Sequence, residues 1–433
     1  MHRHRDISLL NKILLVVYSC LWTVLFKWIA PLLALMSVEV RKQSKNRNMS
    51  GARLRYIQRA RIERKSACVF FCSSAGEYEQ AKPLIDQLSL THYVHVFFSS
   101  VSGYNYAKAM NETCPFDLVA SETSWGWKEV FRVIKPSVTI VVRHGFWPAF
   151  ILMSYQYSRL FAIDVAIRER TSVWSMNSKK YLFRFFDKVW FASSRDMELC
   201  GSRMPNYEVI GNTKFDRAFQ RKQSRKPFRD DVSDRVHRFF PEKKRLVVGS
   251  AWKEDALIVL ESYKLLPESV RSSWGLLLVP HDLSEENVRW MYNACVSQGL
   301  NCMKYTDAVS DGAHVLIVDQ LGVLFELYGC GHSALIGGGF EQGVHNIVEP
   351  AVFNLPLSSG PFIGDDREAW LFERENLLTV VHDSQALAAW LVVQDNNESL
   401  DDRLQPRVMR SLGVTEKIIG KITPYIYENS YTS

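Results

Sequence analysis

Short apolar runs alternate along the chain with segments that have the spacing of amphipathic helices, and the pattern occurs on each side of a basic connector. In the first half the apolar runs occupy residues 66–74, 91–100, 137–144 and 188–194. In the second half they occupy residues 245–251, 274–281, 314–319 and 333–339. Apolar runs of this length that end at turn residues are typical of buried strands. The alternation therefore predicts an α/β protein with two doubly wound parallel sheets that carry helices on both faces.

The length supports the same division, because 433 residues exceed a single core and suit two domains. The net charge of +7 is spread mainly through residues 41–64 and 214–229. It lacks the dense basic face and interleaved aromatic residues of nucleic-acid binders. We therefore expect no nucleic-acid partner, and we attribute the excess to an acidic ligand or an anionic membrane surface.

Composition shifts along the chain predict the domain boundaries. Charged and turn residues between 211 and 231 suit a surface connector between the two domains. The residues after Thr415 are amphipathic and could form a helix that packs back on the first domain. The predicted parts are an anchor with its basic flank (1–47), an N-terminal domain (48–210), a connector (211–244), a C-terminal domain (245–414) and a C-terminal helix (415–433).

The N-terminus differs from the rest, because residues 13–36 are apolar except for Lys27 and have basic residues on both sides. About twenty apolar residues span a bilayer. Lys27 and Pro31 weaken a spanning helix, which leaves an amphipathic anchor on the membrane surface as an alternative. No small-x-small cleavage site follows, so a cleaved signal peptide is disfavoured. The eight cysteines lack any Cys-x-x-Cys pair, which favours a reducing compartment and excludes the usual structural zinc spacing.

Residues 334–361 combine an apolar strand, three glycines, a polar turn, a short helix and a second strand. Gly338 and Gly339 lack a Cβ, so backbone can approach an anion closely, and a helix opening near Asn346 would direct its N–H groups toward it. His345 and Glu349 are further polar groups on that opening. The segment predicts a phosphate-binding turn, although a structural tight turn is the alternative for the glycines alone.

Other polar residues follow the predicted strands, and ligands in parallel sheets bind beyond the carboxyl ends of the strands. Together with the quoted motifs they resemble the Kdo transferase family, and their order and spacing are specific. The motifs are SSAGE (73–77), FWP (146–148), RER (168–170), GNTKFD (211–216), GSAWKED (249–255), PH (280–281), GGGF (337–340), HNIVEP (345–350) and SGP (359–361).

The resemblance implies an inner-membrane glycosyltransferase of lipopolysaccharide biosynthesis, working at the cytoplasmic face. Such enzymes move 3-deoxy-D-manno-octulosonic acid (Kdo) from CMP-Kdo to a lipid A precursor. It also implies a GT-B fold, in which two Rossmann-like domains face a cleft, with the acceptor on the N-terminal side and the nucleotide-sugar on the C-terminal side. The expected partners are CMP-Kdo, the lipid A precursor and membrane lipids.

The resemblance also assigns roles to residues. Glu77 would be the general base that takes the proton of the acceptor hydroxyl, and the alternative is a carboxylate that only stabilises a helix start. If Glu77 were not the base, Glu79, His144 or a substrate group would be. The implied donor-binding residues are Gly249, Ser250, Trp252, His281, Gly338, Gly339, His345, Asn346 and Glu349. The implied acceptor or carboxylate-binding residues are Ser74, Gly76, Arg143, Arg168, Arg170 and Lys214.

Several of these residues have structural alternatives. Ser250 could cap a helix, Lys214 could be an exposed lysine of the connector, and Arg168 and Arg170 could be surface charges. One departure from the family pattern is Gly145, which stands where members commonly carry an acidic residue two positions before Trp-Pro. It leaves open a related GT-B transferase with another sugar or acceptor, or a catalytically silent membrane scaffold.

No Asp-x-Asp motif lies near a predicted strand end. We therefore expect no metal or other cofactor, and an inverting single displacement in which backbone dipoles and basic side chains stabilise the leaving CMP.

Overall fold

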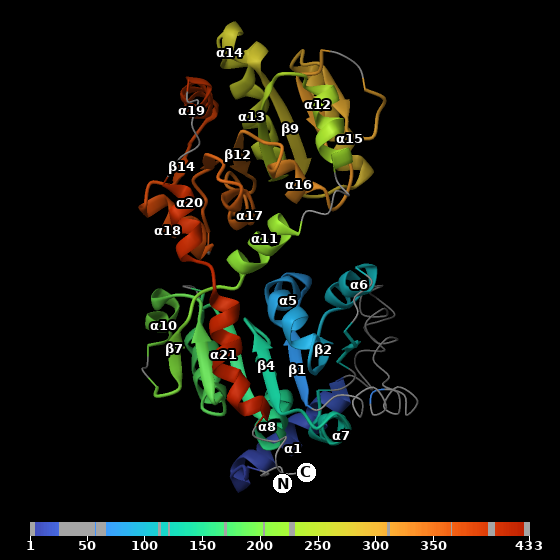
Figure 1. Ribbon diagram of the computed structural model, residues 1–433, viewed down its shortest axis with the longest axis vertical. Helices are drawn as coiled ribbons and strands as arrows, with labels where there is room; N and C mark the ends of the chain where they lie inside the picture. Colours follow the sequence, from blue (N-terminus) through green and yellow to red (C-terminus); the bar gives the residue numbers. More distant parts are fainter. Residues whose placement is uncertain are drawn as a thin grey trace. The chain divides into compact units, whose positions relative to one another are not determined.

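The computed structural model describes residues 5–25, 57, 66–110, 114–119, 122–168, 171–201, 204–224, 230–309, 312–364, 366–396 and 403–427. The chain forms two compact units. The N-terminal unit contains residues 1–217 and 412–433, and the C-terminal unit contains residues 218–411. Each unit is an α/β sandwich around one parallel sheet (Figure 1).

The sheet of the N-terminal unit has seven parallel strands in the order β3-β2-β1-β4-β5-β6-β7. The strands are β1 (Ala67–Cys72), β2 (Tyr93–Phe98), β3 (Phe116–Leu118), β4 (Val138–Val142), β5 (Arg159–Val165), β6 (Lys188–Phe191) and β7 (Tyr207–Val209). The order reverses direction between β1 and β4, which is the switch point where such sheets bind ligands.

Helices cover both faces of this sheet. They are α1 (Leu9–Val24), α5 (Ala75–Ser89), α6 (Val101–Ala109), α7 (Ser124–Ile134), α8 (Pro148–Tyr157), α9 (Val173–Phe183), α10 (Ser194–Cys200) and α21 (Val414–Tyr427). A further helix, α11 (Lys214–Gln223), begins in this unit and ends in the other. Successive residues of a strand point to opposite faces. Accordingly, Phe70 of β1 packs in a core with α5 and α21, whereas Phe71 packs in a second core with α7 and α8.

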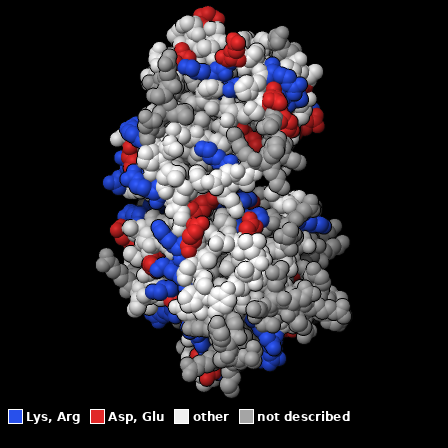
Figure 2. Space-filling model, viewed as in Figure 1, with Lys and Arg blue, Asp and Glu red and all other residues white. Residues whose placement is uncertain are grey.

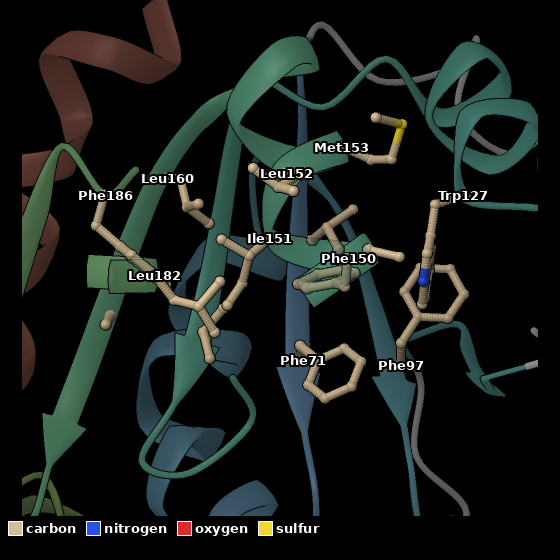
Figure 3. Packing of buried hydrophobic residues seen from close by; sticks show 14 of the residues in the cluster. Phe71, Phe97, Trp127, Phe150, Ile151, Leu152, Met153, Leu160, Leu182 and Phe186 are labelled. Carbon is tan, nitrogen blue, oxygen red and sulfur yellow. The ribbon is translucent and has the colours of Figure 1, made fainter. Parts of the chain in front are cut away.

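The core beneath α7 and α8 combines aromatic rings with aliphatic side chains (Figure 3). The ring centroids of Phe71 and Phe150 are 4.5 Å apart, and those of Phe97 and Trp127 are 5.1 Å apart. Such pairs contribute stability beyond the area they bury. This packing fixes the end of β1 against the start of α8.

The chain returns to the N-terminal unit with α21 (Figure 1). Val414, Ile418, Ile422 and Ile426 follow one another at helical spacing and are all buried in the same core as α5. Asp216 fixes the start of this helix, since its carboxylate accepts the amides of Gly413 (2.7 Å) and Thr415 (2.6 Å). The C-terminal helix is therefore an integral layer of this unit.

The C-terminal unit contains a second seven-stranded parallel sheet, in the order β10-β11-β9-β8-β12-β13-β14. Its strands are β8 (Lys244–Ala251), β9 (Trp274–Pro280), β10 (Cys302–Lys304), β11 (Val315–Ile317), β12 (Ser333–Ile336), β13 (Leu357–Ser359) and β14 (Leu378–Val380). Its helices are α12 (Asp230–Phe239), α13 (Lys253–Leu265), α14 (Glu268–Ser273), α15 (Glu285–Ser297), α16 (Leu324–Tyr328), α17 (Val348–Val352), α18 (Arg367–Arg374), α19 (Ser384–Asn396) and α20 (Leu404–Arg410).

All eight predicted apolar runs contain strands, namely β1, β2, β4, β6, β8, β9, β11 and β12. The second strand of the glycine-rich segment is β13. Five strands were not predicted from the sequence, namely β5 and the three-residue strands β3, β7, β10 and β14. The helix expected near Asn346 begins at Val348, and Asn346 precedes it as a capping residue whose Oδ1 accepts the Val348 amide (3.2 Å).

The N-terminal helix α1 covers residues 9–24. The remainder of the predicted apolar anchor segment, residues 26–36, lies outside the described residues. Within the part of the chain that the structure describes, no helix has the length and hydropathy needed to cross a bilayer. The predicted connector, residues 211–244, contains α11 and α12. The boundary between the two units falls within α11, after Arg217.

Charged side chains on the face in Figure 2 are mixed, with Lys and Arg interspersed among Asp and Glu. The described residues on this face thus form no dense basic patch. The distribution agrees with the mild net charge of +7.

Candidate active site

Glu77 lies in the first turn of α5, directly beyond the carboxyl end of β1. Ser74 caps this helix, because its Oγ accepts the Glu77 amide (3.3 Å). One carboxylate oxygen of Glu77 in turn accepts the amide of Ser73. The side chain is 5% exposed and is held in one orientation at the switch point of the sheet.

Burial raises the pKa of Glu77 to about 7. The Ser73 amide, the charge of Arg143 and the His144 amide act in the opposite direction, because they favour the ionised carboxylate. A carboxylate with a pKa near neutral pH is suited to accept a proton during a reaction. The same contacts would also suit a carboxylate that only stabilises the helix start, so the two roles must be separated by experiment.

A cluster of cationic residues surrounds His144, and one of them, Arg143, also acts on the Glu77 carboxylate. Burial, followed by the charges of Arg143, Lys179 and Arg168, lowers the pKa of His144 to about 3. His144 is therefore neutral at pH 7, whereas the three other residues supply positive charge. The cluster suits an acceptor or sugar with carboxylate or phosphate groups. Arg170, predicted beside Arg168, lies outside the described residues.

Asp164 forms the other polar centre at this sheet edge. Burial raises its pKa to about 6, and hydrogen bonds from Thr213 and the charges of Arg143 and Lys214 oppose the shift. Its Oδ1 accepts the Thr213 amide (3.0 Å), which positions the segment that carries Lys214. Arg143 and Asp164 both have positive φ values, 54° and 53°, so the strand ends that present them are strained.

Gly145 is enclosed, whereas Gly76 is open. A Cβ on Gly145 would lie 2.6 Å from the Phe71 ring, so no side chain fits there without moving the aromatic core. A Cβ on Gly76 would meet only the Ser74 Oγ, at 4.0 Å. Packing against Phe71 therefore excludes the acidic residue that the family pattern places at position 145. At Gly76, by contrast, the first turn of α5 is uncovered beside Glu77.

In the C-terminal unit, a pocket of about 500 Å³ lies at the carboxyl ends of β8, β9 and β12. Six of the nine predicted donor-binding residues line it. They are Gly249, Ser250, His281, His345, Asn346 and Glu349, and they are joined by Leu324, Tyr328, Ile336 and Val344. This volume lies within the range of small-molecule sites.

Trp252, which is absent from this lining, stacks with two histidines that line the pocket. The Trp252 Nε1 donates to His345 Nε2 (2.9 Å), and the His281 ring stacks on both, with centroids 4.6 Å from Trp252 and 4.4 Å from His345. Because Nε2 of His345 accepts this bond, the neutral ring carries its proton on Nδ1. Burial, followed by the charge of His281, lowers the pKa of His345, which keeps the ring neutral.

Gly338 and Gly339 serve the backbone of the turn. Gly338 has φ +87° and donates its amide to Asp255 Oδ2 (2.7 Å), and Gly339 packs against Gly360, whose N is 2.5 Å from the position of a Cβ. These two glycines are absent from the pocket lining. The glycine turn was expected to approach a ligand phosphate, but the Gly338 amide instead donates to the carboxylate of Asp255.

Asp255 organises this turn and was not predicted as a site residue. Its buried carboxylate accepts the amides of Trp252 (2.8 Å), Gly338 (2.7 Å) and Phe340 (3.4 Å). It thereby ties the start of α13 to the glycine turn. The sequence signal was an acidic residue three positions after Trp252, where a carboxylate bonds the start of its own helix.

Ser250 does not cap α13, because that helix begins at Lys253 with Trp252 at the capping position. Ser250 instead lines the pocket with a positive φ of 56°. Glu349 stands in the first turn of α17 and pairs with Arg221, whose Nη1 lies 3.2 Å from its Oε1. Neither Arg221 nor Tyr328 was predicted, and neither was Lys179, whose charge acts on His144.

Among the described residues, no three His, Cys, Asp or Glu side chains are grouped closely enough to hold a metal ion.

The sequence pattern of the family described as 3-deoxy-D-manno-octulosonic-acid transferase (Kdo transferase) matches residues 49–217. A 3-deoxy-D-manno-octulosonic acid transferase from Aquifex aeolicus is 24% identical over 304 residues, covering 69% of this chain and 77% of that protein. Another from Haemophilus influenzae is 21% identical over 384 residues, covering 82% and 86%. The matched segment thus carries the pattern of the Kdo transferase family, and these relatives, similar over most of this chain, bear the same name.

The match to the Kdo transferase family covers the segment with Glu77, Arg143 and Lys214. The solved structure of a glycosyltransferase from Rickettsia africae has a TM-score of 0.60 and 10% identity, covering 85% of this chain and 99% of that one. At this identity the likeness shows the fold alone. The two parallel-sheet α/β domains of this chain resemble those of GT-B glycosyltransferases.

Proposed function

We propose that this protein transfers Kdo from CMP-Kdo to a lipid A precursor in lipopolysaccharide biosynthesis. The observation that carries the proposal is Glu77, a buried carboxylate with a pKa of about 7 that is subject to the charge of Arg143 and lies within the segment matched to the family. The relatives bear the name of this activity. We assign the acceptor to the N-terminal unit and CMP-Kdo to the pocket of the C-terminal unit.

In the proposed step, an acceptor hydroxyl oxygen attacks the anomeric carbon of Kdo while the bond from that carbon to the CMP phosphate oxygen breaks. The bonding electrons leave with CMP, and the hydroxyl proton passes to the Glu77 carboxylate. Attack opposite the leaving group inverts the anomeric configuration. We propose that no metal takes part, on the basis of the missing Asp-x-Asp motif, and that protein dipoles and cationic side chains stabilise CMP.

The function is tested with the purified full chain, CMP-Kdo and a tetra-acylated disaccharide precursor of lipid A. Mass spectrometry should detect the Kdo-modified acceptor, with equal rates in the presence of EDTA. Gly145 favours one second candidate, a related transferase with another acceptor, because packing against Phe71 excludes an acidic side chain there. Transfer from another nucleotide sugar, or to another acceptor only, would replace the proposal. Absence of transfer in the whole panel would favour a scaffold.

We also propose that α1 binds the inner membrane at its cytoplasmic face, lying in the plane of the lipid surface. Its inner side packs on the N-terminal unit, where Ser19 Oγ accepts the Ser124 amide (3.0 Å) and the Trp22 and Trp147 rings meet edge to face at 5.4 Å. Its outer side exposes large apolar residues, namely Leu9, Leu10, Ile13, Leu14, Val16, Val17, Leu21 and Val24. Such a one-sided apolar helix suits the membrane interface.

Replacing Leu10, Leu14 and Leu21 together with glutamine should release the protein from liposomes that contain anionic lipid. Each leucine contributes transfer energy in proportion to its apolar area, so the three changes should lower binding by at least about tenfold. Flotation of the protein with liposomes measures the bound fraction. The matched control is Leu321→Gln, at an exposed leucine of the C-terminal unit. A triple variant that floats as well as wild type would show that attachment lies elsewhere.

A further inference from the structure

The ion pair between Arg221 and Glu349 lies at the edge of the donor pocket. Arg221 extends from α11, and its guanidinium carbon lies 4.0 Å from the centroid of the Phe325 ring on α16. The side chains of Arg221 and Glu349 are 29% and 21% exposed, so the pair is partly shielded from water. The aromatic ring and the carboxylate together hold the guanidinium in place.

The pocket poses an electrostatic problem for an anionic ligand. Its lining contains no Lys or Arg among the described residues, and Glu349 is its only carboxylate. The field of Glu349 reaches into the pocket, since its charge adds to burial in raising the pKa of Tyr328. Two negative charges a few ångströms apart in such a site repel strongly. A phosphate could enter only if the charge of Glu349 were compensated.

We propose that Arg221 is a specificity-determining residue for the donor, because its guanidinium compensates Glu349 and so admits a nucleoside monophosphate. Arg221 thus selects phosphorylated over unphosphorylated nucleosides, while Glu349 remains placed in the pocket to accept hydroxyl hydrogen bonds. The inference rests on the proposed function, in which the donor is a CMP-sugar. It adds a residue on α11 to a site otherwise built from strand ends and their following turns.

Calorimetry with CMP and with cytidine, on the full chain, separates a role in charge from a role in shape. Arg221→Ala should weaken CMP binding by at least about tenfold, because Glu349 then faces the phosphate without the guanidinium charge that pairs with it. Cytidine affinity should change by less than about twofold. Arg221→Lys keeps the charge and should recover most of the CMP affinity. In a Glu349→Gln background, Arg221→Ala should have little effect, since no charge remains to be compensated.

The matched control is Lys222→Ala, which removes a neighbouring cation of α11 whose Nζ donates to the Val352 carbonyl (2.6 Å). It should leave the ratio of CMP to cytidine affinity unchanged. Thermal melting of each variant verifies folding. Two results would overturn this inference and leave the proposed function standing. One is an equal loss of CMP and cytidine affinity in Arg221→Ala, and the other is an undiminished loss of CMP affinity when Arg221→Ala is made in the Glu349→Gln background. Wild-type protein that binds no CMP would overturn the proposed function with it.

Discussion

Glu77→Gln is expected to lower turnover by roughly 10²–10⁴-fold, the usual contribution of a positioned general base. Glutamine keeps the shape of the side chain and can still accept the Ser73 amide, but it cannot take the acceptor proton. CMP affinity and the melting temperature should change little. Steady-state kinetics with saturating acceptor, together with calorimetry for CMP, measure the three quantities.

The pH dependence gives a second readout of the same group. With a pKa of about 7, Glu77 is protonated at lower pH and cannot act as a base. Wild-type kcat should therefore fall about tenfold per pH unit below pH 7 and level off above it. The residual activity of Glu77→Gln should lack this limb.

Glu79→Gln is the matched control, because Glu79 lies on the same helix and pairs with Arg217 (2.7 Å) and Tyr106 (2.8 Å). Its loss should affect stability more than turnover. If Glu77→Gln instead turns over normally and melts earlier, Glu77 only stabilises the helix start. The base would then be sought at Glu79, at His144 or on the substrate.

Asp255→Asn destabilises the C-terminal unit by about 2–5 kcal/mol, because the amide NH₂ faces backbone N–H groups that lose a buried acceptor. Three amides converge on this carboxylate, from Trp252, Gly338 and Phe340. The glycine turn should loosen, and CMP affinity should fall together with stability. Urea unfolding followed by tryptophan fluorescence measures the free energy of unfolding.

Asp282→Asn serves as the control for that change. Asp282 is also near a strand end but is exposed, and its carboxylate accepts the Ser284 amide (2.9 Å) and hydroxyl (2.7 Å). Surface changes of this kind usually alter stability by less than about 0.5 kcal/mol. An Asp255→Asn protein as stable as this control would show that the turn holds its shape without the carboxylate.

The main strands were predictable because buried parallel strands are apolar without interruption. Runs such as β1 and β9 have no polar residue that would fit a helix surface instead. The edge strands β3 and β14 are three residues long and show no periodicity that a sequence could reveal. β5 was missed because Asp164 interrupts its apolar run. The buried Asp164 carboxylate is satisfied by hydrogen bonds from Thr213, 49 positions later in the chain.

The site was predictable where chemistry follows a strand end, and unpredictable where it depends on partners distant in sequence. The position of Glu77 beyond β1 followed from the chain itself. The Trp252–His345 hydrogen bond joins residues 93 positions apart, and the Arg221–Glu349 pair joins residues 128 positions apart. Such pairs require the fold, because local propensity carries no information about which loops meet.

The return of α21 to the N-terminal unit has a consequence for synthesis on the ribosome. Domains that are continuous in sequence fold as they emerge. Here residues 218–411 are made before residues 412–433, which supply Val414, Ile418 and Ile422 to the N-terminal core. At 5–20 residues per second, this interval lasts roughly 10–40 s. During that time one face of the first sheet lacks its α21 layer, so the unit made first is completed after the unit made second.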